Sequence, residues 1–180
     1  MNLFDRSKTQ QGYDPTQITM LRLTAPLLQD YAYIAARMRE DERAQFLAFS
    51  GLAEYVPDAC ALACANLLGP VWLLLADDEP IVVGGFDPIR PGVYEGWQMG
   101  TEAGWEAHGL EITRHTRSIN DDMFARDGVH RLQLCALAGR EQAFDWYERG
   151  LGYAREATLV GFCANGADAI MFARTKKGSA

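Results

Sequence analysis

Residues 93–100 of the sequence are VYEGWQMG, and residues 101–109 are TEAGWEAHG. The first stretch is typical of a strand, and the second, which is polar and contains two glycines, is predicted to be a loop. A helix is predicted from about Leu110 to Phe124, followed by a second strand over residues 130–137. A strand–loop–helix–strand unit of this kind suits an anionic ligand, because the free N–H groups of a helix N-terminus point into the gap between the strands.

Further elements are predicted on both sides of this unit. A helix over residues 141–149 follows it, and the turn signal Asn165-Gly166 joins strands over residues 156–163 and 169–174. Before it, the patterns predict a strand over 18–24, a helix after Pro26, a second helix over 57–68, and a hairpin of strands 71–76 and 81–86. The order β–α–α–β–β–β–α–β–α–β–β indicates an α/β (α+β) fold with a mixed sheet and helices on both faces, in a single domain.

Three stretches are expected to lie outside the packed elements. Residues 1–17 contain few apolar side chains and are predicted to be an extended arm that becomes ordered against a partner. The charged run over residues 37–43 is predicted to be solvated surface with local ion pairs. The domain is therefore assigned to residues 18–175, and residues 176–180 are predicted to be a frayed tail.

The composition narrows the class of protein. A chain of 180 residues with 48% hydrophobic content is long enough for one domain with a proper core. The formal charge of −7 argues against a general nucleic-acid binder, because phosphate contacts need a basic face. No apolar run is long enough to span a membrane and the N-terminus has no apolar signal segment, so we expect a cytoplasmic folding environment.

The cysteines are expected to be free thiols. Cys60 and Cys64 are four residues apart on a predicted helix and therefore share a face. The histidines make no ligand pattern with them; they are His108, His115 and His130. We expect buried thiols in a reduced compartment and no metal site.

Four stretches taken in order resemble the GNAT N-acyltransferases, and within that superfamily the short GNAT-like proteins of tailed bacteriophages, which include small internal virion proteins. They are LRLTA (21–25) followed by DYAYIAARMREDER (30–43), WQMGT (97–101), RHTR (114–117) and FDWYERGLGY (144–153). None of them is a catalytic signature by itself. The likeness covers nearly the whole chain after residue 17, and it implies the GNAT acyl-CoA N-acyltransferase fold.

The resemblance also implies a loop of the type Arg/Gln-x-x-Gly-x-Gly/Ala that holds the diphosphate of an acyl-CoA on backbone N–H groups. The nearest match is EAHGLE (106–111). Its first residue, Glu106, stands where the family has Arg or Gln, and its last residue, Glu111, stands where the family has Gly or Ala. Like charges about 4 Å apart cost on the order of 1 kcal/mol in water, so we expect a degenerate loop and no bound cofactor. If the protein is active, the cofactor is acetyl-CoA, and the residues expected to contact it are Met99, Thr101, His108 and Gly109.

Two residues are candidates for proton transfer. Glu95 on the strand 93–100 is a candidate general base for an amine, and Tyr147 resembles the family tyrosine that protonates the leaving thiolate. Each has a structural alternative: Glu95 as an outward-facing strand residue and Tyr147 as a core aromatic on an apolar helix face. The sequence departs from the family pattern in two places near Tyr147. Tyr147 precedes Tyr153 by one residue more than in the family, and the Asn that often starts this helix is replaced around Arg140.

These observations lead to two hypotheses about function. The first is a virion-associated structural or assembly protein of a bacteriophage, located in the virion or host cytoplasm, with other phage proteins or copies of itself as partners. Aromatic residues of the kind that anchor interfaces favour it, although core and cleft packing explains them equally; they are Tyr13, Tyr55, Trp97 and Trp105. The second hypothesis is an active N-acetyltransferase that transfers an acetyl group from acetyl-CoA to an amine.

Overall fold

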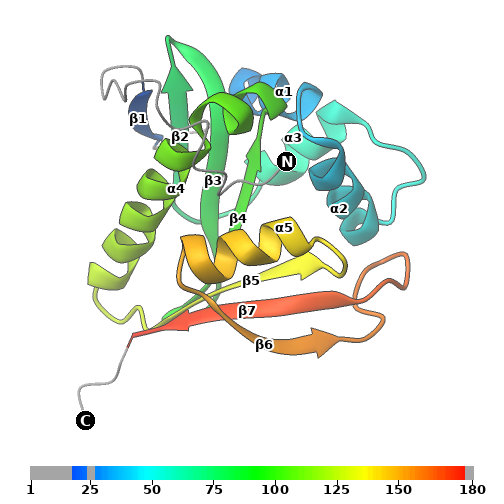
Figure 1. The fold of residues 1–180 in the computed structure, drawn as a ribbon, viewed down its shortest axis with the longest axis vertical. Helices are drawn as coiled ribbons and strands as arrows, with labels where there is room; N and C mark the ends of the chain where they lie inside the picture. The colour runs from blue at the N-terminus through cyan, green and yellow to red at the C-terminus, as the bar shows by residue number, and fades with distance from the viewer. Residues whose placement is uncertain (1–17, 24–26, 177–180) are drawn as a thin grey trace.

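A seven-stranded mixed sheet with the strand order β1-β2-β3-β4-β5-β7-β6 organises the chain (Figure 1). The computed structural model describes residues 18–23 and 27–176, so the expected arm over residues 1–17 lies outside the described part. The strands are β1 Ile18–Leu23, β2 Val71–Ala76, β3 Glu79–Arg90, β4 Val93–Gly100, β5 Arg131–Leu137, β6 Ala154–Leu159 and β7 Ala169–Thr175.

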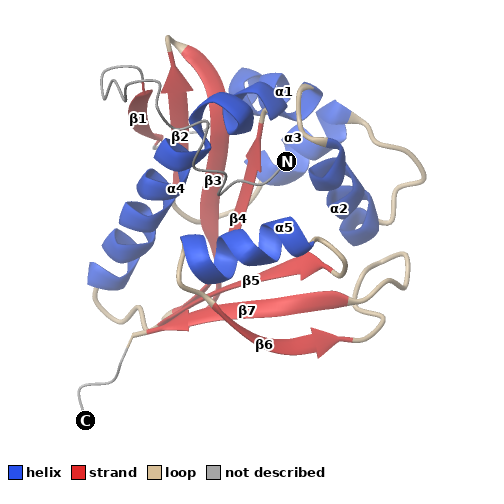
Figure 2. Ribbon diagram, in the orientation of Figure 1, coloured by secondary structure: helices blue, strands red, loops and turns tan. Residues whose placement is uncertain are grey.

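The sheet opens at the boundary between β4 and β5. Strands β1 to β4 pair antiparallel in sequence order, and β5, β7 and β6 form a second antiparallel group. The parallel pairing of β4 with β5 joins the two groups and runs only from Val93↔Arg131 to Glu95↔Gln133. Beyond Glu95 the two strands part, and Figure 2 shows β2–β4 running steeply across the direction of β5–β7.

Helices cover both faces of this sheet, as the sequence predicts. They are α1 Leu28–Ala36, α2 Glu40–Ser50, α3 Pro57–Ala65, α4 Glu102–Ala125 and α5 Glu141–Asp145, which continues as a π-helix, η2, over Trp146–Gly150. One core cluster holds Tyr31 of α1 and Cys60 of α3 against β2–β4. The other holds Ile112 of α4 and Phe144 of α5 against the opposite face.

The predicted loop over residues 101–109 is wrong, because α4 begins at Glu102 directly after β4. Thr101 caps the helix, since its Oγ1 accepts a hydrogen bond of 3.0 Å from the Gly104 N–H. Trp105 anchors the first turn in the core with 5% exposure. His108 (φ −127°, ψ 20°) breaks the helical geometry, so the polar segment forms a short helical stretch joined to a longer one by a kink. Tertiary packing outweighs the polar, glycine-containing composition here.

The charged run over residues 37–43 is also not simply solvated surface. It contains the start of α2, a helix that the sequence patterns did not predict. The side chain of Glu42 is only 9% exposed and pairs with Arg39 at 2.7 Å. Charged residues of α2 face inward because they meet other charged groups there, so the helix has no apolar stripe that a periodicity analysis detects.

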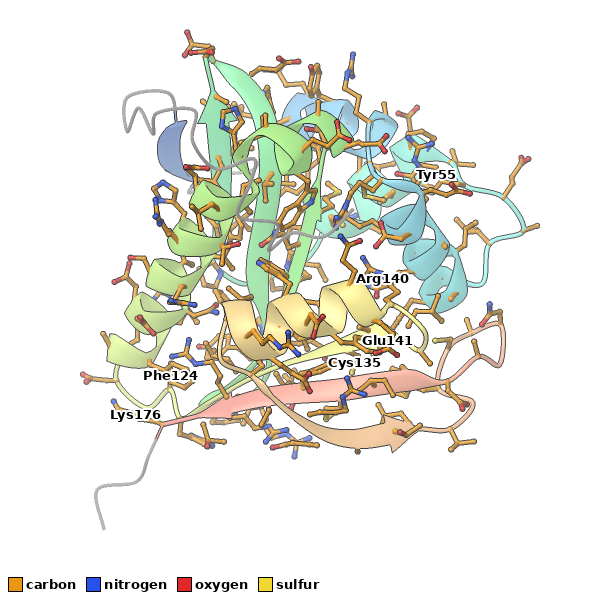
Figure 3. All side chains as sticks on the ribbon, in the orientation of Figure 1. Tyr55, Phe124, Cys135, Arg140, Glu141 and Lys176 are labelled. Carbon is orange, nitrogen blue, oxygen red and sulfur yellow. The ribbon has the colours of Figure 1, made fainter. Side chains whose placement is uncertain are left out.

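Smaller differences concern the C-terminal part. Strand β6 spans Ala154–Leu159, earlier than the predicted 156–163, and the chain reaches β7 through turns at Gly161 and Gly166. Lys176, assigned to the tail, donates a hydrogen bond of 3.1 Å from Nζ to the carbonyl of Phe124, and both residues are labelled in Figure 3. Within the described chain no helix has the length and apolar character needed to cross a membrane.

Candidate functional site

A pocket of about 320 Å³ lies where β4 and β5 part, within the size range of small-molecule sites. Residues of α2, β3, β4, β5, α4 and α5 line it. It reaches both faces of the sheet, since it is lined by Glu95 on one face of β4 and by Gln98 on the other. Gly96 between them leaves the passage open, because an added Cβ would meet nothing closer than 3.5 Å.

Glu95 is half-buried at the last residue pair of β4 and β5. Burial raises the pKa of its carboxyl group, the carboxylate of Asp87 opposite it on β3 raises the pKa further, and hydrogen bonds with Cys135 and Gln133 act against this shift. Burial and the neighbouring Glu95 raise the pKa of the Cys135 thiol to about 12. A carboxyl group with a raised pKa in a cleft is suited to accept a proton near neutral pH.

Tyr147 lies on η2 and lines the same pocket as Glu95. Its ring packs against Trp146 and Phe172, with ring centres 5.4 and 5.3 Å away. Burial raises the pKa of the hydroxyl group, and the positive charge of Arg140 opposes that shift. Tyr147 is thus both a packed aromatic and a pocket residue, so both sequence interpretations describe part of its environment.

Arg140 connects the pocket to α2. It lies at the start of α5 on the side nearest α2 (Figure 3), and its guanidinium binds Asp41 Oδ2 at 2.6 Å and Gln45 Oε1 at 2.7 Å. Gln45 Oε1 also accepts a hydrogen bond from the Leu137 N–H at 3.0 Å. Burial acts to raise the pKa of Asp41, but Arg140 and Arg39 outweigh it and hold that pKa below its usual value.

The other four predicted contact residues are not part of the pocket lining. Met99 is a core residue with 3% exposure. Thr101 is the buried N-cap of α4, and His108 lies at the kink. The carbonyl of Gly109 accepts a hydrogen bond of 2.6 Å from Thr113 Oγ1 inside the helix. The structure therefore brings Glu95 and Tyr147 together and leaves these four outside.

Several backbone N–H groups at the junction of β4 and α4 have partners within the protein. The Gly100 N–H donates to Glu42 Oε2 at 3.0 Å, and the Glu102 N–H donates to the carbonyl of Arg37 at 3.0 Å. The Gly104 N–H is satisfied by Thr101 Oγ1. Burial raises the pKa of Glu42, while Arg39 and the Gly100 N–H oppose the shift. A carboxylate of the protein itself thus lies beside this helix N-terminus.

Glu111, to which the sequence analysis assigned the blocking charge, lies in the body of α4 beyond the kink. It is half-buried and far along the helix from the N-terminal turn that begins at Glu102. The carboxylate that lies beside the helix N-terminus is instead that of Glu42, a residue of α2 to which the sequence analysis assigned no such role.

Side-chain contacts bridge α4 and the α5–η2 segment next to the pocket. Trp146 Nε1 donates to Thr113 Oγ1 at 2.9 Å. The rings of Trp105 and Trp146 meet edge to face with centres 5.1 Å apart, and Arg117 donates to the carbonyl of Gly150. These contacts fix the two helical segments against each other on one side of the pocket.

The aromatics considered as interface anchors are packed within the domain. Trp97 stacks on Tyr31 with ring centres 6.2 Å apart, and Tyr55 donates its hydroxyl to the Ala35 carbonyl at 2.7 Å. Trp105 is buried, and Tyr13 lies outside the described residues. The three described aromatics therefore make the core and cleft contacts of the alternative interpretation.

The four cysteines are free thiols. Cys60 and Cys64 do share a face of α3, and Cys60 is buried. Over residues 18–23 and 27–176, no group of three or more His, Cys, Asp or Glu side chains is arranged to hold a metal ion.

Sequence reasoning missed several pocket residues. They are Arg39, the N-cap residue of α2, Asp41, Glu42 and Gln45 of α2, Gln98 of β4, and Thr116 and Asn120 of α4. The spacing of Thr116 and Asn120, four apart on a helix otherwise apolar on its inner face, is a signal available in the sequence. The α2 residues carry no such signal, because their partners are distant in the chain.

The solved structures that resemble this one at low sequence identity include three acetyltransferases. The ribosomal L7/L12 alpha-N-protein acetyltransferase RimL in complex with coenzyme A has a TM-score of 0.66 and 11% identity over 89% of this chain and 94% of that one. The ribosomal-protein-S5-alanine acetyltransferase of Vibrio fischeri has a TM-score of 0.63 and 14% identity over 92% and 96%. The aminoglycoside acetyltransferase AAC(6')-Ib in complex with ribostamycin and coenzyme A has a TM-score of 0.64 and 16% identity over 91% of this chain and 99% of that one.

No protein-family model and no curated protein matches the chain. The structural likeness nevertheless spans nearly all of this chain and of the three acetyltransferases. The chain therefore has the GNAT acyltransferase fold, which confirms the fold predicted from the sequence.

Proposed function

We propose that this protein is an N-acyltransferase that transfers an acyl group to an amine in the pocket between β4 and β5. One observation carries the proposal: Glu95 and Tyr147, which lie on separate elements 52 residues apart, line the same pocket at the point where the sheet opens. Buried acid–base candidates with raised pKa values in a single cleft are typical of catalytic sites. The three acetyltransferases with the same fold support the reaction class.

The two residues take complementary roles in this proposal. The carboxylate of Glu95 accepts a proton from the acceptor amine as the amine attacks the acyl carbon. The hydroxyl group of Tyr147 supplies a proton to the leaving group, and its raised pKa keeps it protonated at neutral pH. Arg140 beside Tyr147 stabilises negative charge that develops during the transfer.

The acceptor side of the pocket favours a cationic amine. Asp87 and Glu95 are paired across β3 and β4, so two carboxyl groups lie side by side at this wall. An amine that is protonated in water is attracted to such a wall, and Glu95 then removes the proton needed for attack. RimL acts on the N-terminus of a ribosomal protein, and ribostamycin is an aminoglycoside, so protein N-termini and aminoglycosides are acceptors to test.

The residues present fit one half of coenzyme A and not the other. The pocket that passes between β4 and β5 suits the slender arm that carries the thioester. The junction of β4 and α4 does not suit the diphosphate, because the N–H groups of Gly100, Glu102 and Gly104 are bonded within the protein and the carboxylate of Glu42 lies beside them. When bound, an acyl-CoA or related thioester supplies an activated acyl group; the residues of this chain orient the amine and move the protons.

The test is an acyl-transfer assay with acetyl-CoA and a panel of three amines: a ribosomal-protein N-terminal peptide, a polyamine and an aminoglycoside. Acetylated product detected by mass spectrometry, and lost in Glu95→Gln, supports the proposal. Glu79→Gln is the matched control, because Glu79 is exposed at the start of β3 and lies outside the pocket. If no amine gives an acetylated product at millimolar acetyl-CoA, the proposed acyltransferase function is contradicted.

A second candidate is a non-catalytic assembly role in a bacteriophage particle. The internal partners of the α4 N-terminal N–H groups favour it, since a protein without coenzyme needs no free cradle there. The phage assignment itself comes from the sequence resemblance alone. Peptides of this chain in purified phage particles, together with no acyl transfer in the assay above, support this candidate; particles without the chain contradict it.

A further inference from the structure

The last residues of β4 and β5 both bond to side chains of α2. Gly100 ends β4, and its N–H donates to Glu42 Oε2 at 3.0 Å. Leu137 ends β5, and its N–H donates to Gln45 Oε1 at 3.0 Å. Glu42 and Gln45 are three residues apart, so they are neighbours on the surface of one helix. Helix α2 therefore joins the ends of the two strands.

Both of these N–H groups lie on the strand edges that face the opening. The N–H of Thr101, which follows Gly100, donates to a carbonyl of β3 at 2.8 Å. The N–H of Ala138, which follows Leu137, donates to a carbonyl next to β7 at 3.0 Å. N–H groups of successive strand residues point to opposite edges, so those of Gly100 and Leu137 point between β4 and β5. Helix α2 thus supplies the acceptors that the two strands would supply to each other if they stayed paired.

Polar contacts, more than a core, hold the N-terminal half of α2. Ala48 is the only buried residue of this helix, all of which is described. Gln45 Oε1 also accepts a hydrogen bond of 2.7 Å from Arg140 Nη1. Arg140 is the N-cap of α5, which continues into the η2 segment that carries Tyr147. One face of α2 therefore connects the three elements β4, β5 and α5 around the pocket.

We propose that α2 sets the separation of β4 and β5, so that Glu42 and Gln45 are positioning residues for the reaction in the pocket. They act through the strands that they hold. The two strands pair directly over only three residue pairs, so a further contact is needed to fix the angle at which they part. The catalytic consequence rests on the proposed function, whereas the spacing role of α2 can be measured without it.

A change in this separation reaches Glu95 through Cys135. The Cys135 side chain hydrogen-bonds to Glu95, and it lies halfway along β5 between Gln133, the partner of Glu95, and Leu137. A movement of Leu137 therefore also moves Cys135. The bond with Cys135 lowers the pKa of the Glu95 carboxyl group, against the effects of burial and of the carboxylate opposite it on β3, so weakening this bond raises the pKa. The titration of Glu95 thus reports the spacing of the strands.

Amide hydrogen exchange followed by NMR tests the bond to β5. Gln45→Met keeps the length of the side chain and replaces a strong acceptor by a weak one. The Leu137 amide is expected to exchange roughly 10- to 100-fold faster in this variant. The Ala138 amide is the internal folding control, because it is bonded on the other edge of the same strand and should keep its protection.

The bond to β4 is tested in the same way with two substitutions of Glu42. Glu42→Met removes the acceptor, so the Gly100 amide should lose protection while the Thr101 amide keeps it. Glu42→Gln retains an amide oxygen at this position and should restore the protection of Gly100. This pair of variants separates the loss of the acceptor from the loss of the charge.

The positioning role is tested on Glu95 itself. Gln45→Met replaces one neutral side chain by another, so it changes no charge near Glu95. The pKa of the Glu95 carboxyl group, followed by carbon NMR, is expected to rise by about 0.5, whereas a purely structural role lowers the melting temperature and leaves this pKa unchanged. In the acyl-transfer assay kcat should fall roughly 10-fold with KM for the amine within about twofold. Gln29→Met, at an exposed position of α1 outside the pocket, is the matched control.

The outcomes separate this inference from the proposed function. Unchanged exchange of the Leu137 amide in Gln45→Met overturns the inference, and so does an unchanged pKa of Glu95 in that variant. Loss of protection that includes Ala138 assigns α2 a general role in folding and also overturns it. So does a wild-type kcat in Gln45→Met when the wild type is active. If the wild type transfers no acyl group while exchange and pKa respond as expected, the spacing role of α2 is supported and the proposed function is overturned.

Discussion

The Gly100 N–H donates to Glu42 Oε2 at 3.0 Å, and this bond links the end of β4 to a helix that begins 60 residues earlier in the chain. It places a carboxylate of the protein beside the N-terminus of α4. Helix N-termini attract negative charge, and here that charge is intramolecular.

We predict that Glu42→Gln raises the affinity for acetyl-CoA relative to S-acetylpantetheine. The amide oxygen of Gln still accepts from Gly100, whereas the negative charge is removed and, among the described residues, Arg39 keeps only Asp41 as an ion-pair partner. Removing a negative charge about 4 Å from a phosphate of the ligand changes the binding free energy by about 1 kcal/mol, which is roughly fivefold in affinity. Calorimetry with both ligands measures the ratio, and an unchanged ratio contradicts the role assigned to Glu42.

Glu95→Gln is predicted to lower kcat/KM for amine acylation by roughly 10²- to 10⁴-fold, since it removes the general base. Tyr147→Phe removes the proton donor and keeps the aromatic packing against Phe172, so a loss of rate is expected without loss of folding. Circular dichroism of both variants provides the folding control. Wild-type rates in Glu95→Gln contradict the proposed chemistry.

The rate of the wild-type enzyme is predicted to fall as pH is lowered through the raised pKa of Glu95. Glu95 accepts a proton only when ionised, and burial together with Asp87 moves its pKa upward from the model-compound value of 4.5. The acidic limb of the kcat/KM profile should therefore lie above pH 4.5. An Asp87→Asn variant removes one cause of the shift, so its acidic limb should move to lower pH; a limb that does not move contradicts the assignment.

Thr113→Val is predicted to destabilise the fold by about 1–3 kcal/mol, because Trp146 Nε1 loses its acceptor in a buried position. Urea denaturation measures the change. Ser118→Ala is the control on the exposed face of the same helix, where a change within about 0.5 kcal/mol is expected. Equal effects of the two substitutions would show that the α4–η2 contact adds nothing to stability.

Asp41→Asn is predicted to cost about 1 kcal/mol at pH 7, with the value kept small because Asp41 is 45% exposed and screened by solvent. The folded-state pKa of Asp41 is lowered, chiefly by Arg140 acting against burial. Its contribution is therefore present above the unfolded-state pKa and is lost as pH falls through the folded-state pKa. Denaturation at pH 7 and at pH 2 measures this difference.

Asp145→Asn serves as the control for that experiment. Its ion pair with Arg149 is 3.5 Å long and both side chains are exposed, so neither pH should show a measurable effect. A pH-independent loss in Asp41→Asn contradicts the ion-pair explanation and assigns the effect to packing.

The sequence by itself determined the order of the strands and all of the helices except α2, and its resemblance to the GNAT acyltransferases gave the fold. Alternation in residues 93–100 and helical spacing from about Leu110 onward are local patterns that follow from which side of each element faces the core. Glu95 was named as a candidate from its place on the predicted strand 93–100, and Tyr147 from the resemblance to the GNAT family; both lie in elements that the sequence predicts correctly.

Tertiary structure decided everything that depends on contacts between distant segments. Helix α2 was missed because its inward side chains are charged and are stabilised by Arg140, which lies 99 residues beyond Asp41. The first turn of α4 replaced a predicted loop because Trp105 packs into the core. The sequence contains no signal for Glu42 at the N-terminus of α4, since hydrogen bonds between remote residues leave no periodicity in the chain.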